Sequence, residues 1–201
     1  MVSKASESRA IVTRPVPPVS FPAGSRFHEL LQSAAWVHVD HLGWNAVASG
    51  TRGDLGTLRI SVDAGNPIPS FNPKGVALYV PTIERLRAEY GGQLSAAALL
   101  QRAVDDGASA VVATAGSEGA WVKDGNGDPV HVPATPANIV STLGAGDGGQ
   151  EGAVVDVAGL PLVEAAAFAG RTASASCQGL DGRSAIPHQT ITPVLATNLP
   201  A

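Results

Sequence analysis

Short apolar runs alternate with helix-patterned segments along most of this chain. The strand-like runs are residues 36–39, 58–62, 76–80 and 110–113. After the third run, residues 83–90 read as a helix that ends at Gly91-Gly92, and Ser95 precedes a second helix-like segment that ends at Gly107. This alternation is typical of parallel strands joined by crossover helices. The sequence therefore predicts an α/β fold.

The flanking segments define the extent of the predicted domain. Residues 121–122 and 130–132 flank the turn sequence KDGNGDP and predict a β-hairpin. Residues 1–24 are rich in proline, which predicts an extended arm or an edge strand. Ser25 is expected to cap the helix that follows with its hydroxyl. With 44% hydrophobic and 15% charged residues, residues 25–201 can form one domain with a continuous core.

Charge and hydropathy exclude several classes of partner. The net charge is −4 and no run of Lys or Arg occurs, so we expect no nucleic-acid partner and no anionic membrane surface. No stretch approaches the roughly 20 uncharged apolar residues that cross a bilayer. Cys177 is the only cysteine, and we expect it to be a small buried side chain. The opening residues contain no apolar signal segment, which favours a cytoplasmic protein.

One glycine-rich stretch has the pattern of a phosphate site. The sequence GAGD, residues 144–147, follows an apolar segment and precedes a helix-like one, and we call it the glycine loop. Such a loop can direct several backbone N–H groups and a helix dipole toward one anion. Asp147 could then accept a proton from an attacking hydroxyl group. The alternative is that Asp147 only caps the following helix.

The order of motifs resembles a known family. Residues 114–119, Thr-Ala-Gly-Ser-Glu-Gly, follow a strand, and we call them the nucleotide loop; a hairpin ending in HVPA, the glycine loop and a closing SAIP come next. From about Ser95 to Pro187 this order resembles the C-terminal half of ribokinase-like, or PfkB-type, carbohydrate kinases. Residues 27–91 are more weakly similar to the middle of that domain. The resemblance implies a mostly parallel sheet flanked by helices, without the family's N-terminal glycine-rich segment and lid.

The resemblance also implies an activity and the residues that carry it. By analogy with the family, Gly144, Ala145 and Gly146 form the anion hole, and Asp147 is the catalytic base. Thr114, Gly116 and Gly119 line the nucleotide site. The implied reaction is the ATP-dependent phosphorylation of a hydroxyl group on a sugar or related small molecule, with Mg²⁺ and, as a further candidate, a monovalent cation.

Candidate substrate and metal residues lie nearer the start of the chain. Asp40, Asp63 and Asn66 follow predicted strands, where ligands of open α/β sheets collect, although ordinary loop acids explain them equally well. The family's metal-organising N-x-x-E motif falls at residues 82–85, where Glu84 is the acidic candidate. His38, Asp40 and His41 suggest metal ligands, but no further His or Cys with ligand spacing accompanies them.

Several departures from the family pattern support a second hypothesis. Residues 141–143 are Ser-Thr-Leu where the family has Asp-Thr-Thr, Thr82 replaces an Asn, and Gly170 falls where another Asn is common. Gly149 stands where the family has an aromatic residue. The alternative to a kinase is therefore a non-catalytic relative that binds a nucleotide or a protein partner. Because the front of the family's sheet has no counterpart, we also predict a homo-oligomer that covers the exposed edge.

Overall fold

The computed structural model describes most of the chain, and the structural statements below refer to those residues. They are residues 2–3, 8–9, 17, 19–22, 25–51, 55–56, 58–146, 160–182 and 184–186. Asp147 and Gly149 lie outside them, as do residues 11–13 of the proline-rich segment.

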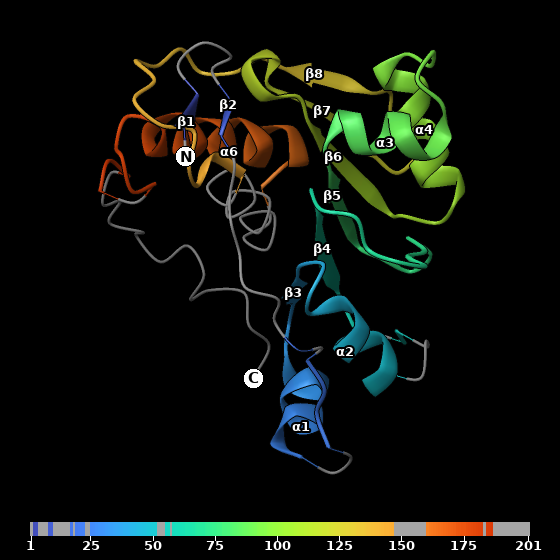
Figure 1. The fold of residues 1–201 in the computed structure, drawn as a ribbon. Coiled ribbons are helices and arrows are strands. Elements are labelled where there is room, and N and C mark those ends of the chain that lie inside the picture. Colours follow the sequence, from blue (N-terminus) through green and yellow to red (C-terminus); the bar gives the residue numbers. More distant parts are fainter. Residues whose placement is uncertain are drawn as a thin grey trace.

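A six-stranded sheet forms the centre of the domain (Figure 1). Its strands lie in the order of the sequence: β3 (Val37–Val39), β4 (Ile60–Ala64), β5 (Leu78–Pro81), β6 (Ala110–Thr114), β7 (Ala120–Asp124) and β8 (Val130–Val132). The first four strands are parallel, and β6, β7 and β8 pair antiparallel. The predicted α/β class and the predicted hairpin are therefore confirmed.

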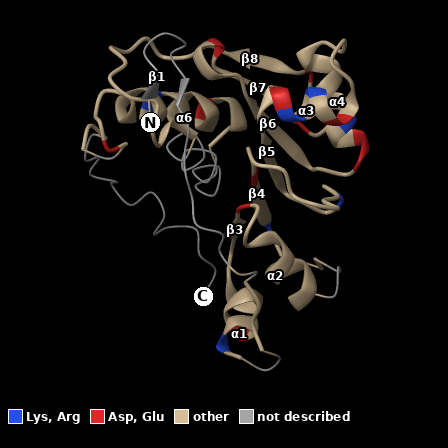
Figure 2. Ribbon diagram, in the orientation of Figure 1, with Lys and Arg blue, Asp and Glu red and all other residues tan. Residues whose placement is uncertain are grey.

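Helices cover both faces of this sheet. They are α1 (Arg26–Ser33), α2 (Trp44–Gly50), α3 (Ile83–Tyr90), α4 (Ala96–Asp105) and α6 (Leu162–Ser176), with the 3₁₀ turn η1 at Gly116–Glu118. Figure 1 shows α3 and α4 on one side of β5 and β6, and α6 on the other side. The charged residues gather on α3 and α4, whereas α6 carries few (Figure 2).

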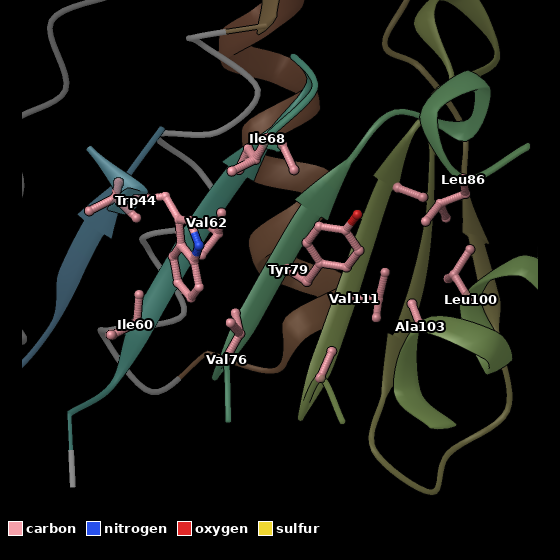
Figure 3. Packing of buried hydrophobic residues seen from close by; sticks show 14 of the residues in the cluster. Trp44, Ile60, Val62, Ile68, Val76, Tyr79, Leu86, Leu100, Ala103 and Val111 are labelled. Atoms are coloured by element: carbon pink, nitrogen blue, oxygen red, sulfur yellow. The ribbon is translucent and has the colours of Figure 1, made fainter. Parts of the chain in front are cut away.

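The larger core lies between the sheet and helices α1 to α4. Tyr79 of β5 is 1% exposed, and its ring lies between Val62 of β4 and Val111 of β6 (Figure 3). Leu86 of α3 and Leu100 of α4 cover the same face and are fully buried. Alternate strand residues thus meet the apolar faces of the crossover helices, which is the packing that the sequence pattern predicts.

The smaller core lies on the opposite face, beneath α6. Val112 of β6, Val122 of β7 and Val132 of β8 pack there with Leu162 and Ala166 of α6. After Leu162, the residues of α6 that face this side are small, among them Ala166, Ala169 and Gly170, so the helix leaves space beside this core.

The predicted and observed strand boundaries differ by two residues at the start of two strands, β4 and β5. The run 58–62 was expected to form a strand, but β4 spans Ile60–Ala64 because Leu58 N donates to Leu55 O at 2.9 Å in a turn. The run 76–80 likewise becomes β5 at Leu78–Pro81. A third difference is the short helix α2, which the sequence reading did not single out.

The predicted hydroxyl cap at Ser25 is wrong. Ser25 occupies the position before α1, but its side chain accepts no backbone N–H of that helix, and Ser25 Oγ instead lies 3.4 Å from His28 Nδ1. In the first 24 residues, β1 (Val2–Ser3) and β2 (Ser8–Arg9) pair antiparallel with each other and form a separate two-stranded sheet.

Candidate functional site

A cavity of about 560 Å³ lies beside α6 at the carboxyl end of β6. Its lining comes mainly from four segments of the chain. They are the nucleotide loop (Thr114, Gly116, Ser117 and Gly119), the segment after β8 (133–137 and Ile139), the glycine-loop region (Thr142, Ala145 and Gly146) and α6 (Ala166, Ala169, Gly170, Ala173 and Ser174, then Cys177). Leaving Asp147 aside, the structure therefore brings together five of the six residues expected in the anion hole and the nucleotide site: Thr114, Gly116, Gly119, Ala145 and Gly146.

The nucleotide loop has a fixed backbone conformation. Ala115 N donates to Gly119 O at 2.8 Å, and Gly119 N donates to Gly116 O at 3.1 Å, which closes the η1 turn. His131 of β8 donates from Nε2 to Glu118 O at 2.8 Å and thereby ties the loop to the neighbouring strand. The loop is thus held by the antiparallel hairpin.

Gly119 lies against the backbone after β8. A Cβ atom at this position would lie 2.1 Å from Val132 O and 2.5 Å from Ala134 N, and Gly119 has a φ of +99°. Only glycine fits such a backbone contact without movement of the hairpin. The last glycine of the nucleotide loop therefore fixes the loop against β8.

The glycine loop reaches the cavity from the other side. Ala145 and Gly146 line the cavity, whereas Gly144 packs against Gly182 in the turn that follows α6. Val140 N and Ser141 N both donate to Cys177 O, at 2.8 and 3.1 Å. The segment that leads into the glycine loop is thus attached to the end of α6.

Three glycines leave space that a ligand can use. A Cβ atom at Gly116, Gly146 or Gly170 would meet no atom within 4 Å, and all three residues line the cavity. The lining contains hydroxyl groups but is mainly apolar, with short side chains along α6. A flat aromatic base fits such an apolar wall, and the glycines allow phosphate groups to approach the backbone closely.

The described part of the cavity lining contains no carboxylate, so it offers no Mg²⁺ cage. Across the described residues, no group of three or more His, Cys, Asp or Glu side chains is placed to hold a metal ion. Glu84 lies in the first turn of α3, is exposed and does not line the cavity. We therefore derive no step through a protein-bound metal.

The expected substrate residues lie at the carboxyl ends of β3 and β4 but do not line the cavity. Asp40 Oδ1 accepts from Leu42 N and Gly43 N at 2.9 and 2.8 Å, which shapes the turn before α2. Asp63 Oδ1 accepts from Gly65 N at 2.8 Å. Asn66 Nδ2 lies 3.5 Å from His41 Nδ1, which joins the two strand ends. These residues thus share one sheet edge, and each also has a local structural role.

The ionisable groups with displaced pKa values lie around α3 and α4 rather than at the cavity. Burial raises the pKa of Tyr79 and of Tyr90, and Tyr90 also donates its hydroxyl to Asp106 Oδ2 at 2.8 Å. Burial raises the pKa of Glu89 as well, while Arg85 at 3.6 Å opposes that rise. Of these contacts, the bond from Tyr90 to Asp106 joins α3 to the end of α4, and none of the three groups lines the cavity.

Sequence reasoning missed most of the α6 wall of the cavity. Ala166, Ala169, Ala173 and Cys177 line it, but only Gly170 had been singled out as a nucleotide position. The available signal was the recurrence of small residues at spacings of three and four, which places them on one helix face. Cys177 is buried, as expected, but it also borders the cavity.

The fold and the cavity together define a mostly parallel α/β domain with a ligand site between two glycine-containing loops. The sequence model of the pfkB family of carbohydrate kinases matches residues 69–189, which is more than half of the chain. The protein belongs to this family. No curated protein sequence matches the chain.

Solved structures of similar fold are kinases. Ribokinase from Thermotoga maritima has a TM-score of 0.68 at 19% identity, covering 80% of this chain and 56% of that one. Arabidopsis thaliana ribokinase, solved with ribose and ATP, has a TM-score of 0.66 at 21% identity, covering 82% and 56%. Burkholderia thailandensis nucleoside kinase, solved with inosine, has a TM-score of 0.59 at 15% identity, covering 78% and 54%. The chain thus spans little more than half the length of these kinases, and the ribokinase-like fold is confirmed.

No helix in the described ranges is long and apolar enough to cross a membrane.

Proposed function

We propose that this protein binds ATP in the cavity beside α6 and transfers its γ-phosphoryl group to a hydroxyl group of a sugar or nucleoside. The observation that carries the proposal is the convergence of the nucleotide loop, the glycine-loop region and α6 on one cavity of about 560 Å³. Two of the structural neighbours were solved with ligands of these classes, ribose with ATP in one case and inosine in the other.

The chemistry follows from the position of the glycine loop. In the proposed reaction the acceptor hydroxyl oxygen attacks the γ-phosphorus, the bond from that phosphorus to the bridging oxygen breaks, and ADP leaves. Asp147 takes the hydroxyl proton. The backbone N–H groups of Gly144 and Gly146 stabilise the charge on the transferring group, because phosphoryl transfer depends on positioning and electrostatics. Ala145 N donates to Thr142 O at 3.3 Å within the loop. ATP would enter as its Mg²⁺ complex, in which the phosphate groups rather than protein side chains would bind the ion.

The acceptor would bind near the ends of β3 and β4. Asp40, Asp63 and Asn66 lie at the same carboxyl edge of the parallel sheet as Thr114, and carboxylate and amide groups suit the hydroxyls of a sugar. A monovalent cation stays a further prediction from the family resemblance.

Calorimetry with Mg·ADP tests the nucleotide site, and release of ADP from ATP across a panel of sugars and nucleosides tests the transfer. We expect saturable ADP binding at or below millimolar concentration and acceptor-dependent ADP release. A folded protein that binds no ADP at millimolar concentration would contradict the proposal.

The second candidate is a relative that binds a nucleotide or a protein partner without catalysis. Leu143 and Thr82 replace polar family residues, and the chain spans 56% of the ribokinases it matches. ADP binding without acceptor-dependent ADP release in the same panel would favour this candidate.

A further inference from the structure

We propose that Gly182, in the turn after α6, is a positioning residue that holds the glycine loop in its phosphate-binding conformation. The inference rests on the proposed function, because it concerns how that loop meets the phosphate groups. Gly182 does not line the cavity, so its effect would act through Gly144 and Leu143.

The turn and the glycine loop meet backbone to backbone. Gly182 is buried and has a φ of +70°, and a Cβ atom there would lie 2.5 Å from Leu143 O and 3.2 Å from Gly144 Cα. A carbon and a carbonyl oxygen cannot be that close, so any side chain at residue 182 must displace the backbone of Leu143. No flexible side chain is available to yield instead.

The contact is reciprocal. Gly144 has a φ of +80°, and a Cβ atom there would lie 3.1 Å from Gly182 Cα and 3.2 Å from Gly182 O. Both segments therefore have a glycine at their point of closest approach. Each of these glycines also has a left-handed φ that other residues rarely adopt. Two such glycines in contact fix the separation and the orientation of the two turns.

Hydrogen bonds support this arrangement. Before Gly182, Cys177 O accepts from Val140 N and Ser141 N at 2.8 and 3.1 Å, which ties the end of α6 to the segment that leads into the glycine loop. Across Gly182, Asp181 Oδ1 accepts from Ser184 N and Ser184 Oγ at 2.9 and 2.8 Å, which closes the turn. A displacement at residue 182 is therefore transmitted to the glycine loop, two residues before Gly146 at the cavity wall.

The consequence should be selective for phosphate. Gly119 and α6 form the wall where a base would lie, whereas Gly182 does not line the cavity and abuts Leu143 and Gly144. The residues that a displaced glycine loop would carry with it are Ala145 and Gly146. A Gly182→Ala variant should therefore lose affinity for ADP while its affinity for adenosine, which has no phosphate, is retained.

The matched control is Gly125→Ala. Gly125 also has a positive φ, +46°, but a Cβ atom there would only touch Ser109 O at 3.6 Å, an ordinary contact. It lies in the turn after β7, at the opposite end of that strand from the nucleotide loop. This variant therefore reproduces the conformational strain without the backbone overlap.

The experiment measures ADP and adenosine dissociation constants for the wild type and both variants by calorimetry. We expect Gly182→Ala to weaken ADP binding by about tenfold or more, the effect of losing charge-assisted hydrogen bonds, and to change adenosine binding by less than about twofold. Gly125→Ala should change neither. Equal ADP affinities in the two variants, or a parallel loss of ADP and adenosine binding in Gly182→Ala, would overturn the proposal.

Amide exchange tests the positioning role without a ligand. The amides of Val140, Ser141 and Ala145 are hydrogen-bonded in this structure, and we expect them to exchange faster in Gly182→Ala than in Gly125→Ala. Asp181→Ala, which keeps Gly182 but removes the acceptor that closes the turn, should show a smaller increase at the same amides. Unchanged exchange in both variants would overturn the inference. A wild type that binds neither ADP nor adenosine, but shows the expected exchange, would instead contradict the proposed function alone.

Discussion

Glycine residues of the nucleotide loop have two distinct structural roles. Gly119 has a left-handed φ and abuts the backbone of residues 132–134, so it determines whether the hairpin can close. Gly116 also has a positive φ, +57°, but its Cβ direction points into open space at the cavity. Gly119 thus supports the fold, and Gly116 leaves room for a ligand.

This difference predicts that alanine at Gly119 mainly affects stability, whereas alanine at Gly116 mainly affects ligand binding. Gly119→Ala should lower the free energy of unfolding by at least about 2 kcal/mol, because it combines backbone overlap with left-handed strain. Gly116→Ala should cost only about 1 kcal/mol but should weaken ADP binding, because its methyl group occupies the cavity. Denaturant unfolding and calorimetry separate the two effects. Similar losses of stability in both variants would contradict this assignment.

Asp147 carries the catalytic part of the proposal. Asp147→Asn keeps the size and the capping ability of the side chain but removes its basicity. If Asp147 is the base, turnover should fall by about 10²- to 10⁴-fold while ADP affinity persists. The comparison is acceptor-dependent ADP release in wild type and variant, with ADP affinity as the control. Equal turnover in the two proteins would leave Asp147 as a helix cap only.

Individual site residues were predictable only where a motif marks them. Thr114, Gly116 and Gly119 were expected from one short motif, and the structure places all three at the cavity. Gly182 carries no local motif, because its importance depends on a contact with a residue 38 positions earlier in the chain. For Asp40 and Asp63 the sequence cannot distinguish a substrate site from a turn, because the carboxylates that suit a sugar also accept hydrogen bonds from nearby backbone N–H groups.

At the scale of elements, hydroxyl caps distinguish two helices that look alike in sequence. Ser95 Oγ accepts from Ala98 N at 3.2 Å at the start of α4, whereas the Ser25 side chain makes no such bond at the start of α1. In the sequence, a serine stands directly before each helix. The Ser25 hydroxyl instead lies beside His28, with 3.4 Å between Ser25 Oγ and His28 Nδ1.

The two serines should therefore respond differently to alanine. Ser95→Ala should lower the free energy of unfolding by about 1 kcal/mol, the usual cost of losing a helix cap. Ser25→Ala should change it by less than about 0.5 kcal/mol, because the half-buried Ser25 hydroxyl makes no capping bond that could be lost. Chemical denaturation followed by circular dichroism measures both values. A larger loss for Ser25→Ala would show that its hydroxyl caps α1 in solution.

The strands of the main sheet were more predictable than the short helix α2. The apolar runs located the four parallel strands, because buried parallel strands need continuous apolar sequence, and the turn sequence located the antiparallel hairpin. α2 was missed because its seven residues begin after Gly43 and end with Gly50, and glycine weakens a helical pattern. Its visible signals were Asp40, which caps the preceding turn, and the spacing of the buried Trp44 and Val47.

At the scale of the whole molecule, β3 ends the main sheet on one side. Among the described strands, it pairs only with β4, so its other edge presents unpaired backbone groups. His38 and Arg59 near this edge are exposed, and His38 Nδ1 lies 2.7 Å from Ser61 Oγ. Unpaired edges favour association with another chain unless a segment covers them.

We therefore predict that the protein self-associates in solution. Light scattering at micromolar concentration should give a mass that is a multiple of the 20.3 kDa chain. The mass should be measured again after dilution, because an oligomer held together through one short strand edge would then dissociate. A mass of one chain at all concentrations would contradict the prediction.

The two walls of the cavity are expected to form at different times during folding, because the chain reverses direction after β6 and makes a local hairpin on one side only. The nucleotide loop belongs to a hairpin whose strands are neighbours in sequence, and contacts of this kind form with little loss of chain entropy. The opposite wall is closed by α6, whose Ser174 Oγ donates to Thr135 O across 39 residues. We expect α6 to dock late, so a ligand that touches both walls would delay its release and slow the unfolding of the chain.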